Sequence, residues 1–209
     1  MVFELKPYTT EFNEQINDLV YHTVHTICGQ FYTPEQCEAW APKSTNKAVW
    51  TDRLEDNYSI MALLKKKPTS HTYVLVCGFG SISAEVPVYL QGFVEDLLGF
   101  SRAEVPNPEH LSLVCNLTYL YVGYFCQRVG VGSLMLTELE EHAAKEGVRA
   151  FITAVPSVAL KFFSAQGYHK LQASPVEALS QNIPHYVMGK ILPPPPPEKV
   201  KRSRYRDQY

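Results

Sequence analysis

The stretch Leu120-Tyr-Val-Gly-Tyr-Phe-Cys-Gln-Arg-Val-Gly-Val-Gly-Ser133 decides the fold, because a β-rich run passes through a glycine-bearing loop into a long amphipathic helix. The start of a helix leaves backbone N–H groups without partners, and the aligned peptide dipoles make that end positive. Gly130 and Gly132 carry no side chain, so an anion can approach these amides closely. The stretch therefore predicts a phosphate or pyrophosphate site, although an ordinary strand-to-helix turn can carry the same glycines.

Two widespread phosphate-binding loops do not fit these residues. The loop of nucleoside triphosphatases needs Lys and then Ser or Thr after its glycines, whereas Gly132 is followed by Ser133 and Leu134. The dinucleotide-binding loop needs a small residue at position 135, which is Met135 here. The phosphate group is therefore expected to belong to another class of cofactor.

Three motifs resemble those of the GNAT superfamily of acyl-CoA N-acyltransferases. The first is the strand end 120–122 followed by the spacing Gln-x-x-Gly-x-Gly at 127–132. The second is the segment 159–168, which is similar to the helix and turn of the family, and the third is the closing strand 186–192. Their order and spacing together make the resemblance specific.

The resemblance implies an α/β fold, with a mixed sheet whose central strands splay apart and whose faces are covered by helices. It implies an N-acetyltransferase that uses acetyl-CoA as co-substrate and moves the acetyl group directly to an amine in a ternary complex. The segment 32–42 and Trp50 are similar to the small YafP-like branch. The residues that the resemblance assigns to acetyl-CoA are Leu120, Tyr121, Val122, Gln127, Arg128, Val129, Gly130, Val131, Gly132, Ser133 and Phe162.

The catalytic residues stay unassigned. The family often offers a tyrosine to the leaving thiolate, and Phe163 aligns with it; Val158 stands where a polar residue is usual. Amine acetylation also needs a base, yet the stretch 116–121 contains no carboxylate. Tyr119 and Tyr121 are weak candidates for a proton relay, with packing at a wet edge as the alternative.

The acceptor side is less defined. Tyr32, Trp40 and Trp50 are weak candidates for the substrate pocket, because the resemblance places the N-terminal helices beside it; core packing is the alternative. Cys126 adjoins the loop, but the family uses no cysteine nucleophile. The seven histidines are scattered along the chain, so no metal site is expected. The identity of the amine cannot be read from the sequence.

Composition narrows the class of protein. A net charge of −2 and a pI near 6.4 give no general attraction to nucleic acid or to an anionic membrane. No apolar run reaches the roughly eighteen residues of a spanning helix. Five cysteines without a C-x-x-C spacing suit reduced thiols in a cytoplasmic protein. A homodimer is left open.

One domain is expected over residues 1–192, with an insertion at 84–110 that carries a short helix. Residues 193–209 begin with prolines and end in a basic run, which predicts a disordered tail that solubilises the protein, binds a partner or directs nuclear entry. Helices are predicted at 10–29, 33–41, 48–54, 133–147 and 157–166, the last with Ser157 as its cap. Strands are predicted at 3–7, 58–64, 72–79, 111–122, 150–155 and 186–192.

Two other functions compete with the enzyme. The substitutions at Val158 and Phe163 favour a catalytically degenerate module that binds acyl-CoA as a sensor or scaffold. The tail favours an interaction protein whose function lies in residues 193–209. Deletion of that tail separates the second alternative from the enzyme.

Overall fold

A computed structural model of the chain describes residues 3–43, 46–66, 73–100, 107–172, 176–177 and 183–193. The tail predicted at 193–209 lies, apart from Pro193, outside the described residues. The strands are β1 (Phe3–Pro7), β2 (Tyr58–Lys66), β3 (Tyr73–Ser83), β4 (Val114–Val122), β5 (Ala150–Pro156), β6 (His169–Lys170), β7 (Val176–Glu177) and β8 (Pro184–Ile191). The helices of at least four residues are α1 (Asn13–Ile27), α2 (Pro34–Trp40), α3 (Val49–Leu54), α4 (Val88–Gln91), α5 (Val94–Leu98), α6 (Pro108–Leu111), α7 (Val131–Lys145) and α8 (Leu160–Ala165).

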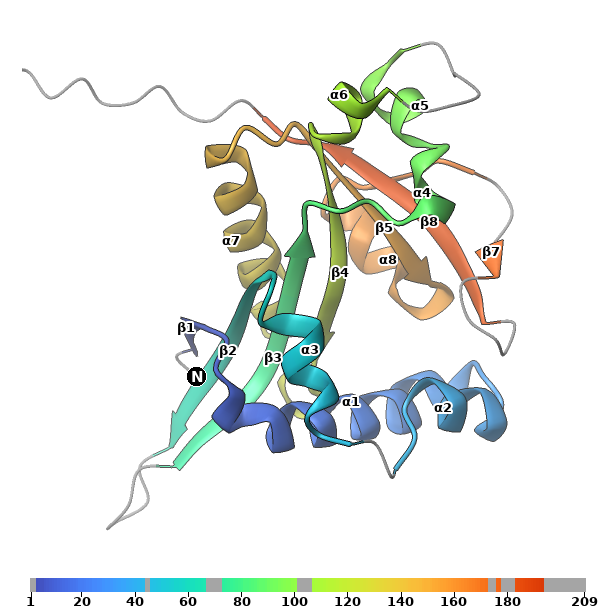
Figure 1. The fold of residues 1–209 in the computed structure, drawn as a ribbon. Coiled ribbons are helices and arrows are strands. Elements are labelled where there is room, and N and C mark those ends of the chain that lie inside the picture. Colours follow the sequence, from blue (N-terminus) through green and yellow to red (C-terminus); the bar gives the residue numbers. More distant parts are fainter. Residues whose placement is uncertain are drawn as a thin grey trace, which may run out of the picture.

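One mixed sheet organises the chain, as predicted. Its strand order is β1-β2-β3-β4-β5-β8-β6, and β7 pairs separately with β8. Neighbouring strands are antiparallel except β4 and β5, which run parallel (Figure 1). The short strands β6 and β7 were not predicted, because two residues are too few for an alternating pattern.

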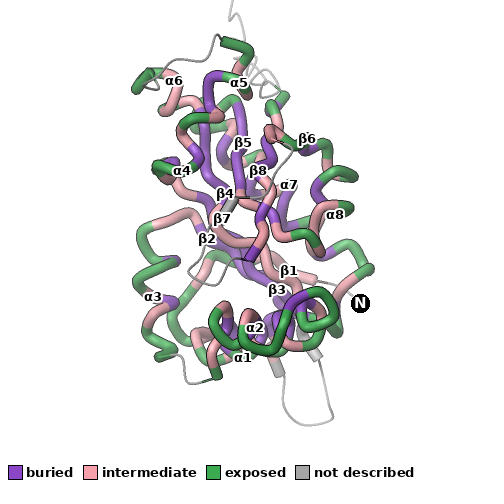
Figure 2. The backbone as a smooth tube through the Cα atoms, turned by 90° about the vertical axis from the view of Figure 1, so that its right-hand side faces the viewer, coloured by how far each residue is buried: buried purple, intermediate pink, exposed green. Residues whose placement is uncertain are grey.

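The two faces of the sheet carry different helices. Along β2, Ile60 and Ala62 pack in the cluster that contains Met135 and Leu139 of α7. Met61 and Leu63 belong instead to the cluster formed with α1, α2 and α3. This alternation follows from the period of two along a strand. Figure 2 shows the buried segments concentrated along the strands, with exposed segments on the outer sides of the helices.

The start of α2 confirms a local prediction. The Thr33 hydroxyl accepts from the Gln36 amide at 3.3 Å, and the Gln36 side chain accepts from the Thr33 amide at 2.9 Å. Pro34 occupies the first helical position, where a missing N–H costs nothing. The capping box therefore orients the helix that carries Trp40.

Several predicted boundaries differ from the structure, and three of them have a clear local reason or consequence. The strand expected from residue 111 begins at Val114, because Asn107 caps the short helix α6 before it. The helix expected from residue 133 begins at Val131. The prediction that Ser157 caps α8 is wrong, because Ser157 is the first residue of a 3₁₀ turn (Ser157–Ala159) and its hydroxyl makes no cap hydrogen bond.

The segment predicted as an insertion at 84–110 contains α4, α5 and the start of α6, and its residues 101–106 lie outside the described ones. Leu90 and Val94 are buried against strands β4, β5 and β8. Glu95 is buried and accepts from the Asn107 amide at 3.0 Å and from His110 Nδ1 at 2.7 Å. These contacts hold α5 and α6 together.

Candidate active site

A cleft of about 1040 Å³ lies where β4 and β5 separate. One end is formed by the loop before α7, and the walls come from β4, β5 and the start of α8. The other end is formed by α1, α2 and α3, together with Pro87 and Tyr89 of the 84–110 segment. One continuous cavity therefore connects the predicted phosphate loop with the aromatic N-terminal helices.

The separation of β4 and β5 is visible in the register. Backbone pairing extends only from Val114–Ala150 to Asn116–Ile152, although both strands continue beyond these pairs (Figure 1). At the branch point, the Thr153 hydroxyl donates to the Leu117 carbonyl at 2.8 Å. A side chain thus replaces the next ladder bond, and the predicted splay of the central strands is present.

The splay leaves one edge of β4 without a partner strand. The Gly123 amide donates to the Cys77 carbonyl of β3 at 2.8 Å, which fixes the direction of the backbone groups at this end of β4. Because these directions alternate along a strand, the main-chain groups of Tyr121 face β3, whereas those of Leu120 and Val122 face the gap. The Val122 carbonyl accepts from the Gln127 side chain at 3.0 Å.

The loop before α7 has an unusual backbone. Arg128 has φ 64° and Gly130 has φ 91°, so two residues adopt the left-handed conformation close together. The first amide of α7 to donate to the preceding turn is that of Leu134, to the Gly130 carbonyl at 3.0 Å. The N–H groups of the earlier helical residues lack an intrahelical acceptor. They form the positive end of a helix of 15 residues.

Gly132 has a second role that the sequence did not reveal. A Cβ at this position would lie 3.2 Å from Cζ of Phe162 and 3.5 Å from Cγ2 of Val122. The absent side chain therefore lets the first turn of α7 approach both β4 and α8. Phe162, which the resemblance assigns to acetyl-CoA, lines the cleft at this point.

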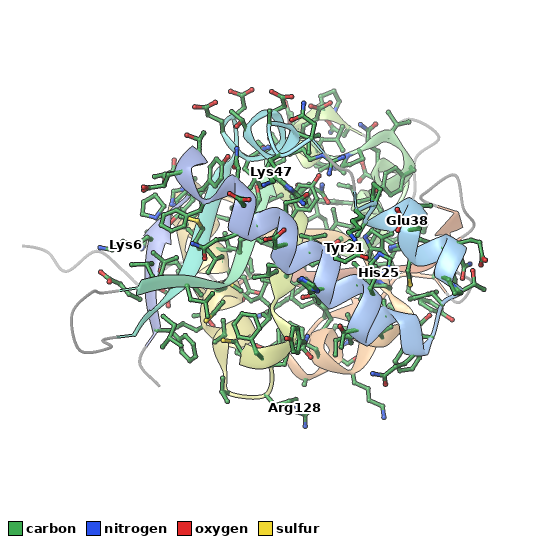
Figure 3. The ribbon with its side chains drawn as sticks, turned by 90° about the horizontal axis from the view of Figure 1, so that it is seen from below. Lys6, Tyr21, His25, Glu38, Lys47 and Arg128 are labelled. Atoms are coloured by element: carbon green, nitrogen blue, oxygen red, sulfur yellow. The ribbon has the colours of Figure 1, made fainter. Side chains whose placement is uncertain are left out.

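The predicted cofactor residues do not all lie in the same environment. The side chain of Val131 is buried in the core and that of Val129 is half exposed, and neither lines the cleft. Arg128 is exposed and projects from the outer edge of the molecule (Figure 3). Arg128 nevertheless borders the cleft, as do the other predicted positions. These are Leu120, Tyr121, Val122, Gln127, Gly130, Gly132, Ser133 and Phe162.

Trp40 and Tyr121 join the N-terminal helices to β4. The Trp40 indole N–H donates to the Tyr121 hydroxyl at 2.9 Å, across 81 positions of sequence. Burial raises the pKa of Tyr121 far above its ordinary value, an effect that the Trp40 hydrogen bond only partly opposes. Burial also raises the pKa of Tyr119. Both phenols therefore keep their protons near neutral pH, so they can donate hydrogen bonds but cannot act as bases.

The three aromatic residues predicted for the substrate pocket separate. Trp40 and Trp50 line the cleft, whereas Tyr32 lies beside it. The Tyr32 hydroxyl accepts from the Ser157 amide at 3.0 Å, so it ties α1 and α2 to the end of β5. Trp50 packs edge-on against Tyr119, with ring centroids 5.9 Å apart.

His185 lines the cleft and was not singled out by the sequence. It is the second residue of β8, opposite Pro156 at the end of β5. Its ring lies 5.8 Å from that of Trp40, centroid to centroid. A histidine in a short polar run carries no local signal of such a position, which depends on strands far apart in the sequence.

Two residues that the sequence raised, one beside the loop and one in place of a tyrosine, are buried although both border the cleft. Cys126 is 1% exposed, and its Sγ lies 2.7 Å from Sγ of Cys77. Phe163 is buried among core residues, edge-on to Phe162 and Tyr168. The Tyr168 hydroxyl donates to Glu140 at 3.0 Å and does not line the cleft. Tyr168, which follows α8, therefore does not replace the missing hydroxyl of Phe163.

Tyr21 of α1, which also lines the cleft, forms a cluster with two residues nearer the surface. The Tyr21 and His25 rings lie 4.2 Å apart, and His25 Nε2 is 3.7 Å from Glu38 of α2 (Figure 3). Within the described residues, no group of three or more His, Cys, Asp or Glu side chains is arranged to hold a metal ion. No helix among the described segments is long and apolar enough to cross a bilayer.

Solved structures have the same fold. A GCN5-related N-acetyltransferase (aminotransferase, class II) from Rhodopseudomonas palustris is 20% identical, with a TM-score of 0.63 over 92% of this chain and 99% of that one. The PaiA N-acetyltransferase of Thermoplasma acidophilum, in complex with coenzyme A, is 14% identical, with a TM-score of 0.61 over 91% and 99%. A ribosomal-protein-alanine N-acetyltransferase from Brucella melitensis is 14% identical, with a TM-score of 0.57 over 90% and 99%.

Identities this low establish a shared fold and nothing more specific. No curated protein matches the chain in sequence. The sequence pattern of the acetyltransferase (GNAT) family, however, matches residues 50–168, which is more than half of the 209 residues. The match takes in both walls of the gap and the loop before α7, and the chain therefore belongs to the GNAT acetyltransferase family.

Proposed function

We propose that the protein is an acetyl-CoA-dependent N-acetyltransferase that passes the acetyl group directly to an amine in a ternary complex. The observation that carries this proposal is the continuity of the cleft. The same cavity reaches from the N-terminus of α7, along the open edge of β4, to Trp40 and Trp50. Cofactor and acceptor can therefore occupy it together.

The residues present fit coenzyme A. The unpaired amides at the start of α7 offer several donors to a diphosphate. The main-chain groups of Leu120 and Val122 face the gap, where they can pair with the amides of a pantetheine arm. The approach of Gly132 to Phe162 leaves an apolar wall between these two regions. Bound acetyl-CoA would supply an acyl group activated as a thioester.

Tyr121 and Trp40 have a defined electrostatic role in this proposal. The Tyr121 hydroxyl accepts the Trp40 N–H and has no acceptor for its own proton among the described residues. That proton is free to donate to charge that develops on oxygen or sulfur during acyl transfer. The half-buried position of Tyr121 strengthens such a bond, because a hydrogen bond is stronger in surroundings less polar than water.

Direct transfer needs no covalent acyl-enzyme. Cys126 is the cysteine that borders the loop, and its burial beside Cys77 supports a packing role. Cys126→Ala is therefore expected to keep turnover. Loss of turnover at unchanged affinity for acetyl-CoA would contradict the direct mechanism.

A second candidate function is an acyl-CoA-binding module without catalysis. Phe163, buried where the family often has a tyrosine, and Val158 in the 3₁₀ turn before α8 favour it. The two functions differ in one measurement. Isothermal titration calorimetry with acetyl-CoA tests binding, and release of free thiol in the presence of amines tests transfer. Binding without thiol release for any amine supports the module.

The finer predictions from the sequence remain proposals. They are the YafP-like branch, the amine as acceptor, the cytoplasmic location and a homodimer. The structures of PaiA with coenzyme A and of the ribosomal-protein-alanine enzyme support the cofactor class and the amine class by analogy. Purified protein, acetyl-CoA and an amine panel provide the direct test.

A further inference from the structure

The cleft contains no carboxylate among its described lining residues. Its charged side chains there are Arg53, Arg128 and Lys161. Its phenols and thiols are poor proton acceptors near neutral pH; burial raises the pKa of the Cys28 thiol, for example, to about 12. A transfer that starts from an ammonium ion nevertheless needs a proton acceptor. Of the described lining residues, this leaves His185.

The hydrogen bond of His185 selects one tautomer. Nδ1 lies 2.8 Å from the carbonyl oxygen of Ile183. A carbonyl can only accept, so Nδ1 carries the hydrogen and Nε2 of the neutral ring presents its lone pair. Among the described residues, Nε2 has no hydrogen-bond partner. The ring is thus oriented by the backbone just before its own strand and has one free basic nitrogen.

The surroundings keep His185 neutral. Its side chain is 6% exposed, and burial lowers its pKa, while the Ile183 carbonyl partly opposes that shift. α2 presents the uncharged ring of Trp40, and β5 presents Pro156. The titratable groups next to Trp40 are the Tyr32 and Tyr121 phenols, both with raised pKa values. No described charged side chain therefore holds a proton on the ring.

We propose that Nε2 of His185 is the base that deprotonates the acceptor amine, an inference that rests on the proposed function. The acceptor enters as an ammonium ion and gives one proton to Nε2. Its nitrogen lone pair then forms the C–N bond, while the C–S bond of the thioester breaks and its electron pair goes to sulfur. The second proton of the nitrogen goes to sulfur, and the imidazolium returns its proton to water.

The charge of the cleft supports this proton transfer. An ammonium group in a site with Arg53 and without described carboxylates is poorly stabilised, so its pKa falls toward that of the base. Arg53 makes no ion pair with a described residue and lies 5.3 Å from the Trp50 ring centroid. The acceptor class that fits is an amine with an apolar or aromatic body, rather than a polycation.

His185→Asn tests the role most sharply, because an Asn amide can still donate to the Ile183 carbonyl but offers no basic nitrogen. The probes are phenethylamine, phenylalanine, lysine and spermidine, with thiol release as the readout. His142→Asn, at a ring stacked on Tyr58 outside the cleft, is the matched control.

For the amine that reacts best, His185→Asn is expected to lower kcat at pH 7 by about 10²–10⁴-fold with the affinity for acetyl-CoA unchanged. In the wild type, kcat/KM rises with pH through a midpoint below about 6.5, because only the neutral imidazole accepts a proton. The variant lacks this limb. The loss of kcat in the variant becomes smaller as the pH approaches the pKa of the ammonium group, about 10, because the amine is then already neutral. The His142→Asn control keeps the wild-type profile.

Several results would overturn the proposal. An unchanged acid limb in His185→Asn would assign the base elsewhere. Nitrogen NMR that finds the hydrogen of His185 on Nε2 would contradict the tautomer. Failure of the wild type to bind acetyl-CoA would contradict the proposed function itself. Binding and turnover that do not depend on His185 would contradict only this inference. Binding without turnover of any probe overturns both.

Discussion

The loop before α7 can be tested with two glycines at opposite ends of that helix. Gly130 at its start and Gly147 after its end have φ values of 91° and 88°, and a Cβ at either position would meet nothing within 4 Å. Alanine at either site is therefore penalised only by the left-handed backbone, at about 1–2 kcal/mol. For a chain of this size, that corresponds to a fall in Tm of roughly 2–8 °C.

The two variants differ in what relaxation of the backbone disturbs. At Gly130 the relaxation moves the unpaired amides of the first turn, whereas at Gly147 it moves the far end of α7. A lost hydrogen bond to a charged group costs about 1.5–3 kcal/mol. Gly130→Ala is therefore expected to raise the Kd for acetyl-CoA by about 10–150-fold, and Gly147→Ala to leave it unchanged.

Urea unfolding and calorimetry on both variants measure the two effects separately. Similar losses of stability with a selective loss of affinity in Gly130→Ala would support the amide site. Equal affinities in both variants would refute the reasoning, because the diphosphate would then be held elsewhere. The same conclusion would follow if both variants lost affinity in proportion to their stability.

Three other changes test separate parts of the structure. Trp40→Phe removes the N–H that binds the Tyr121 hydroxyl, and steady-state kinetics should show a fall in kcat of about 2–10-fold, the equivalent of one neutral hydrogen bond. Thr153→Val removes the hydroxyl bond at the branch of β4 and β5, and urea melts should show a loss of about 1–3 kcal/mol. The Asn107 amide holds the pKa of Glu95 below its ordinary value, so the carboxylate stabilises the fold above about pH 4.3 and this contribution disappears as pH falls through the lower folded pKa. Glu95→Gln should therefore be less stable than the wild type at pH 7 and should lose less stability on acidification, as measured by Tm against pH.

The elements with local signals could be predicted. The capping box at Thr33 specifies its helix through residues three apart, and the glycines near 130 mark a strand-to-helix junction. Two predicted boundaries were wrong because a short helix or a 3₁₀ turn precedes the predicted element, as before β4 and before α8. The strand before Val122 starts late because Asn107 and Pro108 favour a helical turn, a signal that the apolar run obscured.

The acceptor side could not be predicted from local patterns. Trp40 and Tyr121 meet although 81 positions separate them, and His185 reaches the cleft only because β8 pairs with β5. The scattered histidines led to the expectation of no metal site, because a metal site needs several ligands together. A single base needs only one histidine, a free nitrogen and a cavity, and these become visible only in the fold.

The proposed cofactor site could be predicted and the acceptor site could not, because the first depends on backbone groups and the second on side chains. In the proposed complex, acetyl-CoA is held mainly by backbone amides, at the start of α7 and along the open edge of β4. Main-chain donors exist whatever the side chains are, so such a site needs only the fold and a few glycines that keep the approach open. The fold itself is shared with solved structures at sequence identities of 8–20%. Chemistry at the acceptor depends on side chains, which are free to change. In this proposal, Phe163 leaves the backbone binding site intact, and the proton transfers are assigned to Tyr121 and His185 on other elements.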